Sequence, residues 1–196
     1  RPLRLETLQA AARGGPVVVL NVSRWRCDAL IVRTSDVELV ELPDLTEDQV
    51  LGQVRRYLAA VGDRQGEVGR DLGPAGGSST GTALDDCLRW MWTAVAEPVL
   101  DHLGYSASPA EGDDWPRVWW CPTGPLTLLP LHAAGEHRTP GAAVLDRVIS
   151  SYTPTLRALR DAGDRPDRAA GPDRMLFTGM PVTPGQRDLP DVLREE

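Results

Sequence analysis

The sequence predicts an α/β domain whose central sheet is mostly parallel. Short apolar segments with the composition of β-strands alternate along the chain with helical patterns, which is the element order of layered α/β folds. The 196 residues are 41% hydrophobic and 25% charged, enough for one soluble domain with a real hydrophobic core. We expect residues 1–15 to form a helix and linker from an upstream region, and residues 16–196 to belong to one domain.

The first quarter of the chain is predicted to be rich in β-strands. Residues 5–13 have the apolar spacing of a short helix that ends at a Gly-Gly-Pro sequence. Extended segments follow at residues 17–22, 27–33 and 37–42. The three polar residues 34–36 are short enough to form a hairpin turn between the last two segments.

Two amphipathic helices are predicted next. Thr46 and Gln49 fit a capping box, in which each side chain satisfies a backbone N–H of the first helical turn. One apolar stripe follows, and its members are Val50, Val54, Tyr57, Leu58 and Val61. Residues 62–82 contain hardly any apolar side chain, so we expect a mobile loop there.

The second helix is predicted over residues 83–103. Its apolar side carries Leu84, Leu88, Met91, Val95 and Val99. Pro98 should bend this helix, because its ring clashes with the carbonyl of Ala94 and one backbone hydrogen bond is lost.

The second half of the chain is predicted to alternate between strands, loops and helices. In order, we expect a strand at 117–121, an apolar loop at 122–134, an extended segment at 144–153, a short helix at 155–162, a mobile linker at 163–173, a strand at 174–179 and the start of a helix at 189–196.

Charge and composition exclude several classes of protein. The 28 acidic residues outnumber the 21 basic ones, all of which are arginine, so a nucleic-acid binder is not expected. No apolar run approaches the roughly 20 residues that span a membrane. The residue usage is typical of a GC-rich bacterial genome. Three cysteines without a C-x-x-C pair predict neither disulfides nor a cysteine zinc site, and favour a reducing, cytoplasmic location.

The cysteines are the first candidates for chemistry. Cys27 lies beside Arg24 and Arg26, and positive neighbours can lower a thiol pKa and activate it. Cys27 also opens an apolar strand, where cysteine packs as a small hydrophobic residue, and we favour that interpretation. Cys87 and Cys121 are predicted to lie in the core. We therefore assign no catalytic residue.

Histidines and glycines give no stronger candidate. His132 and His137 are five residues apart, which does not match the i, i+4 spacing of helical metal ligands. His102 near a helix end is expected to act through the helix dipole. The glycine-rich residues 73–81 lack a Gly-Lys-Ser/Thr ending, so nucleotide binding has little support. We expect no cofactor and no metal site. Most of the six tryptophans should fill the core, with one or two left for a partner surface.

One segment is more specific than these patterns. Residues 119–135 read Trp-Trp-Cys-Pro-Thr-Gly-Pro-Leu-Thr-Leu-Leu-Pro-Leu-His-Ala-Ala-Gly, and this resembles the CHAT domain family of caspase-like bacterial domains, often joined to tetratricopeptide repeats. Further matches are Ser-Ser-Tyr-Thr-Pro-Thr-Leu-Arg-Ala-Leu at 150–159 and the segment 175–179 leading to Leu-Pro at 189–190. Residues 37–43 and the helix predicted after them also resemble the beginning of the family's domain. The resemblance thus covers the chain from about Pro16 onward.

The resemblance implies a caspase-like layered sandwich with a central, mainly parallel sheet that is incomplete in this chain. Active members are cysteine endopeptidases with a His/Cys dyad, in which the imidazole activates the thiol and backbone N–H groups stabilise the oxyanion. The family places that histidine before a glycine at the end of a later strand, and the cysteine after the next strand. Neither motif occurs here, so the resemblance implies an N-terminal, non-catalytic portion of a signalling or defence effector.

The expected partners follow from the same resemblance. They are the C-terminal remainder of the domain and a protein or peptide substrate or regulatory protein. Two alternatives stay open: a non-enzymatic interaction or scaffold module, and, with less support, a small-molecule or nucleotide binder. The chain starts at Arg1 and stops at what looks like the opening of a helix. We therefore expect both ends to be cut, through excision, incomplete order or cleavage after about residue 196.

Overall fold

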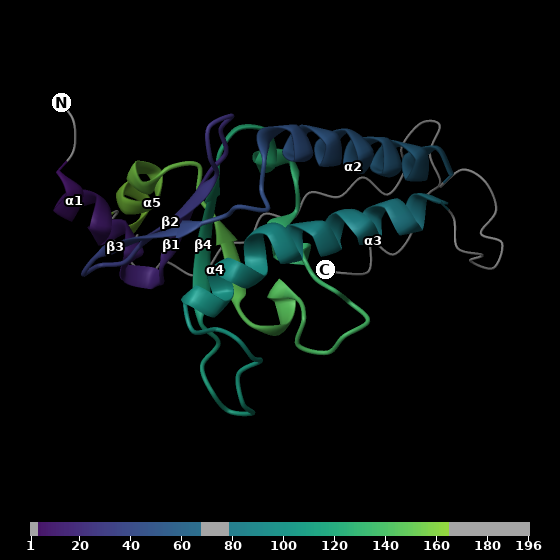
Figure 1. Cartoon of the computed structure of the whole chain (residues 1–196). Helices are drawn as coiled ribbons and strands as arrows, with labels where there is room; N and C mark the ends of the chain where they lie inside the picture. The colour runs from purple at the N-terminus through teal and green to yellow at the C-terminus, as the bar shows by residue number, and fades with distance from the viewer. Residues whose placement is uncertain (1–3, 68–78, 165–196) are drawn as a thin grey trace, which may run out of the picture. The chain divides into compact units, whose positions relative to one another are not determined.

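A five-stranded mixed sheet organises the part of the chain that the structure describes, residues 4–67 and 79–164 of a computed structural model (Figure 1). The strands are β1 (Val17–Asn21), β2 (Asp28–Val32), β3 (Val37–Glu41), β4 (Arg117–Pro122) and β5 (Ile149–Tyr152). Their order across the sheet is β3-β2-β1-β4-β5. β1, β4 and β5 are parallel, whereas β2 and β3 are antiparallel to their neighbours. The predicted α/β fold with a parallel core is thus confirmed.

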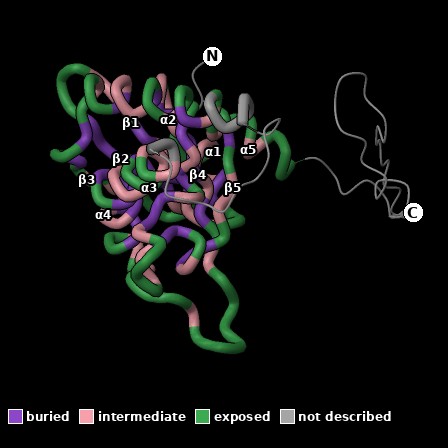
Figure 2. Tube along the Cα trace, turned by 90° about the vertical axis from the view of Figure 1, so that its right-hand side faces the viewer, coloured by how far each residue is buried: buried purple, intermediate pink, exposed green. Residues whose placement is uncertain are grey.

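Helices cover both faces of this sheet. The helices are α1 (Leu5–Gln9), α2 (Glu47–Glu67), α3 (Ser79–Met91), α4 (Glu97–His102) and α5 (Leu156–Gly163). α2 and α3 pack side by side, and α1 lies beside α5 at the other end of the view (Figure 1). Buried residues concentrate in the three central strands, β1, β2 and β4, whereas β3 and β5 consist of exposed and half-buried residues (Figure 2).

Strand alternation divides the buried side chains between two clusters. Val18 and Leu20 of β1 point into the larger one, which they share with side chains of α2, α3 and α4. Val17 points to the opposite face, where Ala12 and Leu159 pack. Because successive side chains of a strand face opposite sides of a sheet, β1 contributes to both clusters at once.

The start of α2 confirms the predicted capping box. The backbone N–H of Thr46 donates to Gln49 Oε1 at 3.0 Å, and the backbone N–H of Gln49 donates to Thr46 Oγ1 at 3.3 Å. The predicted apolar stripe is wrong at Leu58, whose side chain is exposed, whereas Ala60 is buried. The buried face of α2 is therefore rotated toward Ala60, because these two residues lie on opposite flanks of the stripe.

The loop predicted over residues 62–82 is wrong at its two ends. α2 continues through Glu67 and α3 begins at Ser79, so both ends of the predicted loop are helical. Once a helix has started, each added residue gains a backbone hydrogen bond without needing an apolar side chain. Residues 68–78 lie outside the described residues.

The bend predicted at Pro98 takes the form of a wider helical turn. A π-helical turn, Trp92–Ala96, separates α3 from α4, and Pro98 stands in the first turn of α4. The N–H of Glu97 donates to the Trp92 carbonyl, five residues back, so the widened turn lies directly before the proline. The single long helix is thus divided one turn before the proline.

The remaining predictions that fall on described residues agree with the structure except at one point. The extended segment predicted over residues 144–153 begins instead with a 3-10 turn, Val144–Asp146, because the N–H groups of Arg147 and Val148 both donate to the Val144 carbonyl. α5 starts as predicted, with Thr155 Oγ1 accepting from the N–H of Ala158 at 3.0 Å. The strand predicted at 174–179, the helix at 189–196 and most of the linker at 163–173 lie outside the described residues.

The close approach of the Gly135 and Ala143 backbones, in the segment after β4, can be tested by substitution. A Cβ atom at Gly135 would lie 2.8 Å from the Cα of Ala143, its partner in an isolated β-bridge. We expect Gly135→Ala to lower the free energy of unfolding by about 1–3 kcal/mol, because the two backbones must move apart. The measurement is urea unfolding followed by circular dichroism.

Gly52→Ala is the matched control for this change. Gly52 lies inside α2 with no atom within 4 Å of an added Cβ. This substitution should raise stability by about 0.5–1 kcal/mol through helix propensity. Equal stability of the two variants would contradict the close approach at Gly135.

Candidate functional site

One edge of the sheet gathers the polar and aromatic groups of interest. β1, β3, β4 and β5 run in the same direction and end at this edge, and β2 begins there. In open α/β sheets, ligands bind outside the carboxyl ends of the parallel strands. Two clusters stand at this edge, one beyond β1 and β3 and the other beyond β4 and β5.

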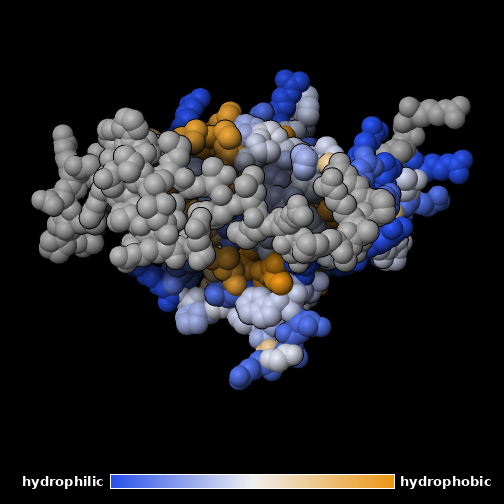
Figure 3. All heavy atoms as spheres, turned by 180° about the vertical axis from the view of Figure 1, so that it is seen from behind, coloured by the Kyte–Doolittle hydropathy of each residue, from blue (hydrophilic) through white to orange (hydrophobic). Residues whose placement is uncertain are grey.

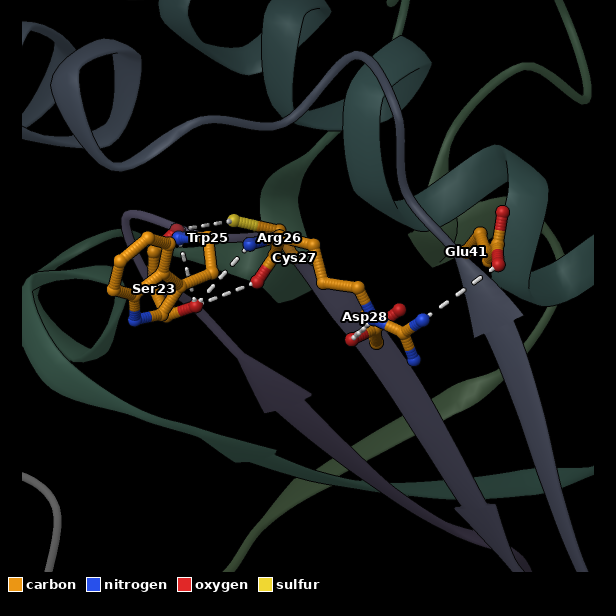
Figure 4. Close-up of polar contacts among 6 residues, drawn as sticks. All are labelled: Ser23, Trp25, Arg26, Cys27, Asp28 and Glu41. Carbon is orange, nitrogen blue, oxygen red and sulfur yellow. Dashed lines mark hydrogen bonds and ion pairs between the residues drawn. The ribbon is translucent and has the colours of Figure 1, made fainter.

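The first cluster is built on the connection from β1 to β2. The Ser23 hydroxyl donates to the Arg26 carbonyl at 2.8 Å and accepts from the N–H groups of Trp25 and Arg26, both at 3.3 Å (Figure 4). Three hydrogen bonds from one hydroxyl fix this turn, as serine often does by bonding to nearby backbone groups. Trp25, at the tip, is 80% exposed.

Arg26 lies between two carboxylates in the same cluster. Its Nε donates to Asp28 Oδ2 at 2.8 Å, and its Nη1 is 3.9 Å from Glu41 Oε1 (Figure 4). Asp28 is only 5% exposed, and its Oδ1 has no hydrogen-bond partner in the described part of the chain. A buried carboxylate oxygen without a partner is costly, so Asp28 leaves negative charge only partly compensated.

Two adjoining hollows flank Trp25 and Arg26. One, of about 290 Å³, has an apolar wall of Leu42, Pro43 and Leu45. The other, of about 330 Å³, extends to Glu47 and Asp48 at the start of α2.

The second cluster joins β5 to the segment that follows β4. The backbone N–H of His132 donates to the Tyr152 hydroxyl oxygen at 2.9 Å, and His132 Nδ1 is 3.0 Å from the same oxygen. The two rings meet edge to face. Burial raises the pKa of the Tyr152 hydroxyl, so it is a neutral hydrogen-bonding group at physiological pH.

At the same edge, the side chain of Thr123, which follows β4, forms hydrogen bonds with the end of β1. The Thr123 hydroxyl donates to the Leu20 carbonyl at 2.7 Å and accepts from the N–H of Val22 at 3.4 Å. The position from which the β1–β2 connection departs is therefore set by β4, which lies about a hundred residues further along the chain.

The three cysteines flagged in the sequence are all buried. Burial raises the pKa of Cys87 to about 11 and also raises that of Cys121. The Sγ atoms of Cys27 and Cys121 lie 3.6 Å from the backbone carbonyls of Ser23 and Pro154. Arg24 and Arg26, the neighbours that favoured a reactive Cys27, turn instead to the Trp25 ring and to Asp28.

Each histidine is engaged with a group other than a thiol. His102 Nε2 is 3.0 Å from Glu38 Oε2, an interaction that, together with Arg33, lowers the pKa of the Glu38 carboxyl. His137 Nε2 donates to the Ala133 carbonyl at 2.9 Å. Within residues 4–67 and 79–164, no cysteine and histidine form a hydrogen-bonded pair, and no three metal-ligating side chains gather into a metal site.

The tryptophans divide as the sequence predicts. Trp120 is completely buried and donates from Nε1 to Ser150 Oγ at 3.0 Å, and the buried Trp92 lies under the Arg147 guanidinium. Trp25 and Trp115 are exposed. Sequence reasoning missed Asp28 and its hydrogen bond to Arg26, although an aspartate opening an apolar strand was a visible signal.

The raised thiol pKa values can be tested by alkylation. With a pKa of about 11, only about one Cys87 thiol in a thousand is ionised at pH 8. We expect iodoacetamide to leave Cys87 and Cys121 unmodified in the folded protein over a period in which all three cysteines react in denaturant, as read by peptide mass spectrometry. Modification of folded Cys87 at the denatured rate would contradict this.

Comparison with known proteins identifies the family. The CHAT domain family model matches residues 85–195, more than half of the chain. A search of curated proteins found no match. The described residues contain no helix that is both long and apolar enough to cross a membrane. β4, β5 and the segment between them, where the sequence resemblance is strongest, lie within the matched region, and the chain therefore belongs to the CHAT domain family.

Proposed function

We propose that the chain is the N-terminal, non-catalytic portion of a CHAT-type, caspase-like cysteine endopeptidase domain. In this proposal the His/Cys dyad is contributed by polypeptide beyond Glu196, and the whole protein is a bacterial, cytoplasmic signalling or defence effector. One observation carries the proposal. The chain belongs to this family, yet its three cysteines are buried in the described part of the fold, where a thiol is not available as a nucleophile.

The chemistry of a cysteine peptidase explains why these thiols are unsuitable. The attacking species is the thiolate, which needs a base within hydrogen-bonding distance and open access to a peptide carbonyl. Burial keeps Cys87 and Cys121 protonated, which is the opposite of activation. Tyr152, rather than a thiol, occupies Nδ1 of His132.

The edge of the sheet at β5 supports completion by further polypeptide. Among the described residues, β5 pairs only with β4 and leaves Ile149 and Tyr152 exposed. Unpaired strand edges readily accept another strand. The face opposite to the view of Figure 1 also carries apolar patches among its hydrophilic side chains (Figure 3). We infer that the C-terminal remainder of the domain continues the sheet from β5.

A non-enzymatic docking module is the second candidate. The observation that favours it is Trp25, a large aromatic side chain that is exposed on a turn fixed by Ser23. Aromatic residues exposed on rigid elements are typical of protein-binding surfaces.

The two candidates are distinguished in the natural polypeptide that continues past Glu196. The peptidase proposal expects a His-Gly motif and a separate cysteine in that continuation. Alanine at that cysteine should abolish cleavage of a co-expressed partner protein, because the nucleophile is lost. Cleavage is read by gel electrophoresis and intact mass.

Cys27→Ala in the same polypeptide is the matched control and should retain cleavage. Cleavage that survives loss of the downstream cysteine, or is abolished by Cys27→Ala in a folded variant, overturns the peptidase proposal. A continuation without the dyad, together with partner binding that persists in every cysteine variant, favours the docking module.

A further inference from the structure

The β1–β2 connection carries the most exposed large hydrophobic side chain in the described part of the chain. Trp25 is 80% exposed, compared with 44% for Trp115. Both hollows beside Trp25 reach the carboxyl edge of the sheet. We call the residues that line these hollows the Trp25 surface: Ser23, Arg24, Trp25, Arg26, Cys27, Asp28, Glu41, Leu42, Pro43, Leu45, Thr46, Glu47 and Asp48.

We propose that the Trp25 surface docks a short segment of another polypeptide that carries an arginine or lysine side chain. The basic side chain lies against the Trp25 ring and pairs with the carboxylates of the surface. This role is independent of proteolysis, and it belongs to residues that precede the region matched by the family model.

Charge complementarity selects a cationic occupant. The Trp25 surface carries four carboxylates, of Asp28, Glu41, Glu47 and Asp48, against the two guanidinium groups of Arg24 and Arg26, which leaves two negative charges in excess. Arg26 is already engaged by Asp28 and Glu41. Its positive charge is therefore largely compensated before a ligand arrives.

The buried Asp28 is an independent second observation. Its side chain is more than nine-tenths buried beside the hollow, and Oδ1 has no partner in the described part of the chain. One Arg26 hydrogen bond leaves the carboxylate incompletely satisfied, and a second cation brought close to it lowers that cost. Asp28 therefore adds an incompletely paired negative charge to the lining of the hollow that it shares with Trp25.

Arg24 demonstrates that the indole accepts a guanidinium. The central guanidinium carbon of Arg24 lies 4.5 Å from the centroid of a Trp25 ring, which is the geometry of a cation–π contact. An indole has two faces, and at 80% exposure the ring retains area for a second cation. The Ser23 turn holds the backbone of Trp25 in place, so little backbone freedom is lost on binding.

Pro43 gives the rest of the segment an exposed apolar surface to pack against. Leu42 and Leu45 are almost completely buried, and Pro43 beside them is exposed. Volumes of about 290 and 330 Å³ are each sufficient for one or two side chains. The surface thus combines an aromatic anchor, an exposed proline and several carboxylates, as peptide-binding sites commonly do.

The test is fluorescence anisotropy with two labelled peptides of matched length. The probe is fluorescein-Gly-Ser-Arg-Leu-Arg-Ser-Gly, and the control peptide has glutamate in place of both arginines. We expect the arginine peptide to bind the 196-residue chain saturably, with a Kd that rises with salt, and the glutamate peptide to bind at least about tenfold more weakly.

Three variants assign the binding to the Trp25 surface. Trp25→Ala should raise the Kd about tenfold or more, and Glu41→Gln about threefold, because each removes one recognition element from a side chain that is mostly exposed. Trp115→Ala is the matched control for loss of a surface tryptophan and should change the Kd by less than about twofold.

Any of three results overturns the proposal. These are no saturable binding of the arginine peptide up to millimolar concentration, equal binding of the two peptides, and equal loss of binding in Trp25→Ala and Trp115→Ala. None of these readouts depends on cleavage, so failure of this proposal is distinguishable from failure of the peptidase proposal.

Discussion

The position of β1 at the centre of the sheet is the constraint on which the other elements depend. β1 pairs antiparallel with β2 on one side and parallel with β4 on the other. Val17 and Val18 are completely buried on opposite faces, so this strand contributes to both hydrophobic clusters. A continuous apolar run suits a strand that is covered on both faces.

The same strand brings the candidate groups to one edge. Thr123 fixes the end of β1 against β4, and from that point the Ser23 turn directs Trp25 outward while Arg26 reaches back to Asp28. Tyr152 is the last residue of β5, and it binds His132 in the segment that follows β4. The Trp25 surface and the edge strand β5 are therefore positioned by the same sheet. The Trp25 surface offers side chains to further polypeptide, whereas β5 offers unpaired backbone groups.

The cysteines show how burial decides chemistry. Positive neighbours in the sequence identified Cys27 as the one thiol with an activating environment, yet both arginines have other partners in the folded chain. Cys87 and Cys121 lie among apolar side chains, where the thiolate is disfavoured. Trp25 and Asp28 line one hollow only in the folded chain, and no local pattern in the sequence predicts that they do.

The sequence by itself determined the elements that depend on near neighbours. The Thr46–Gln49 capping box, the β2–β3 hairpin and the Thr155 cap are formed by groups a few residues apart, and the 119–135 motif identified the family. Only the tertiary structure decided the strand order, the exposure of Leu58 and the unpartnered oxygen of Asp28. These features depend on contacts between distant segments, such as Val22 with Thr123, which local spacing does not specify.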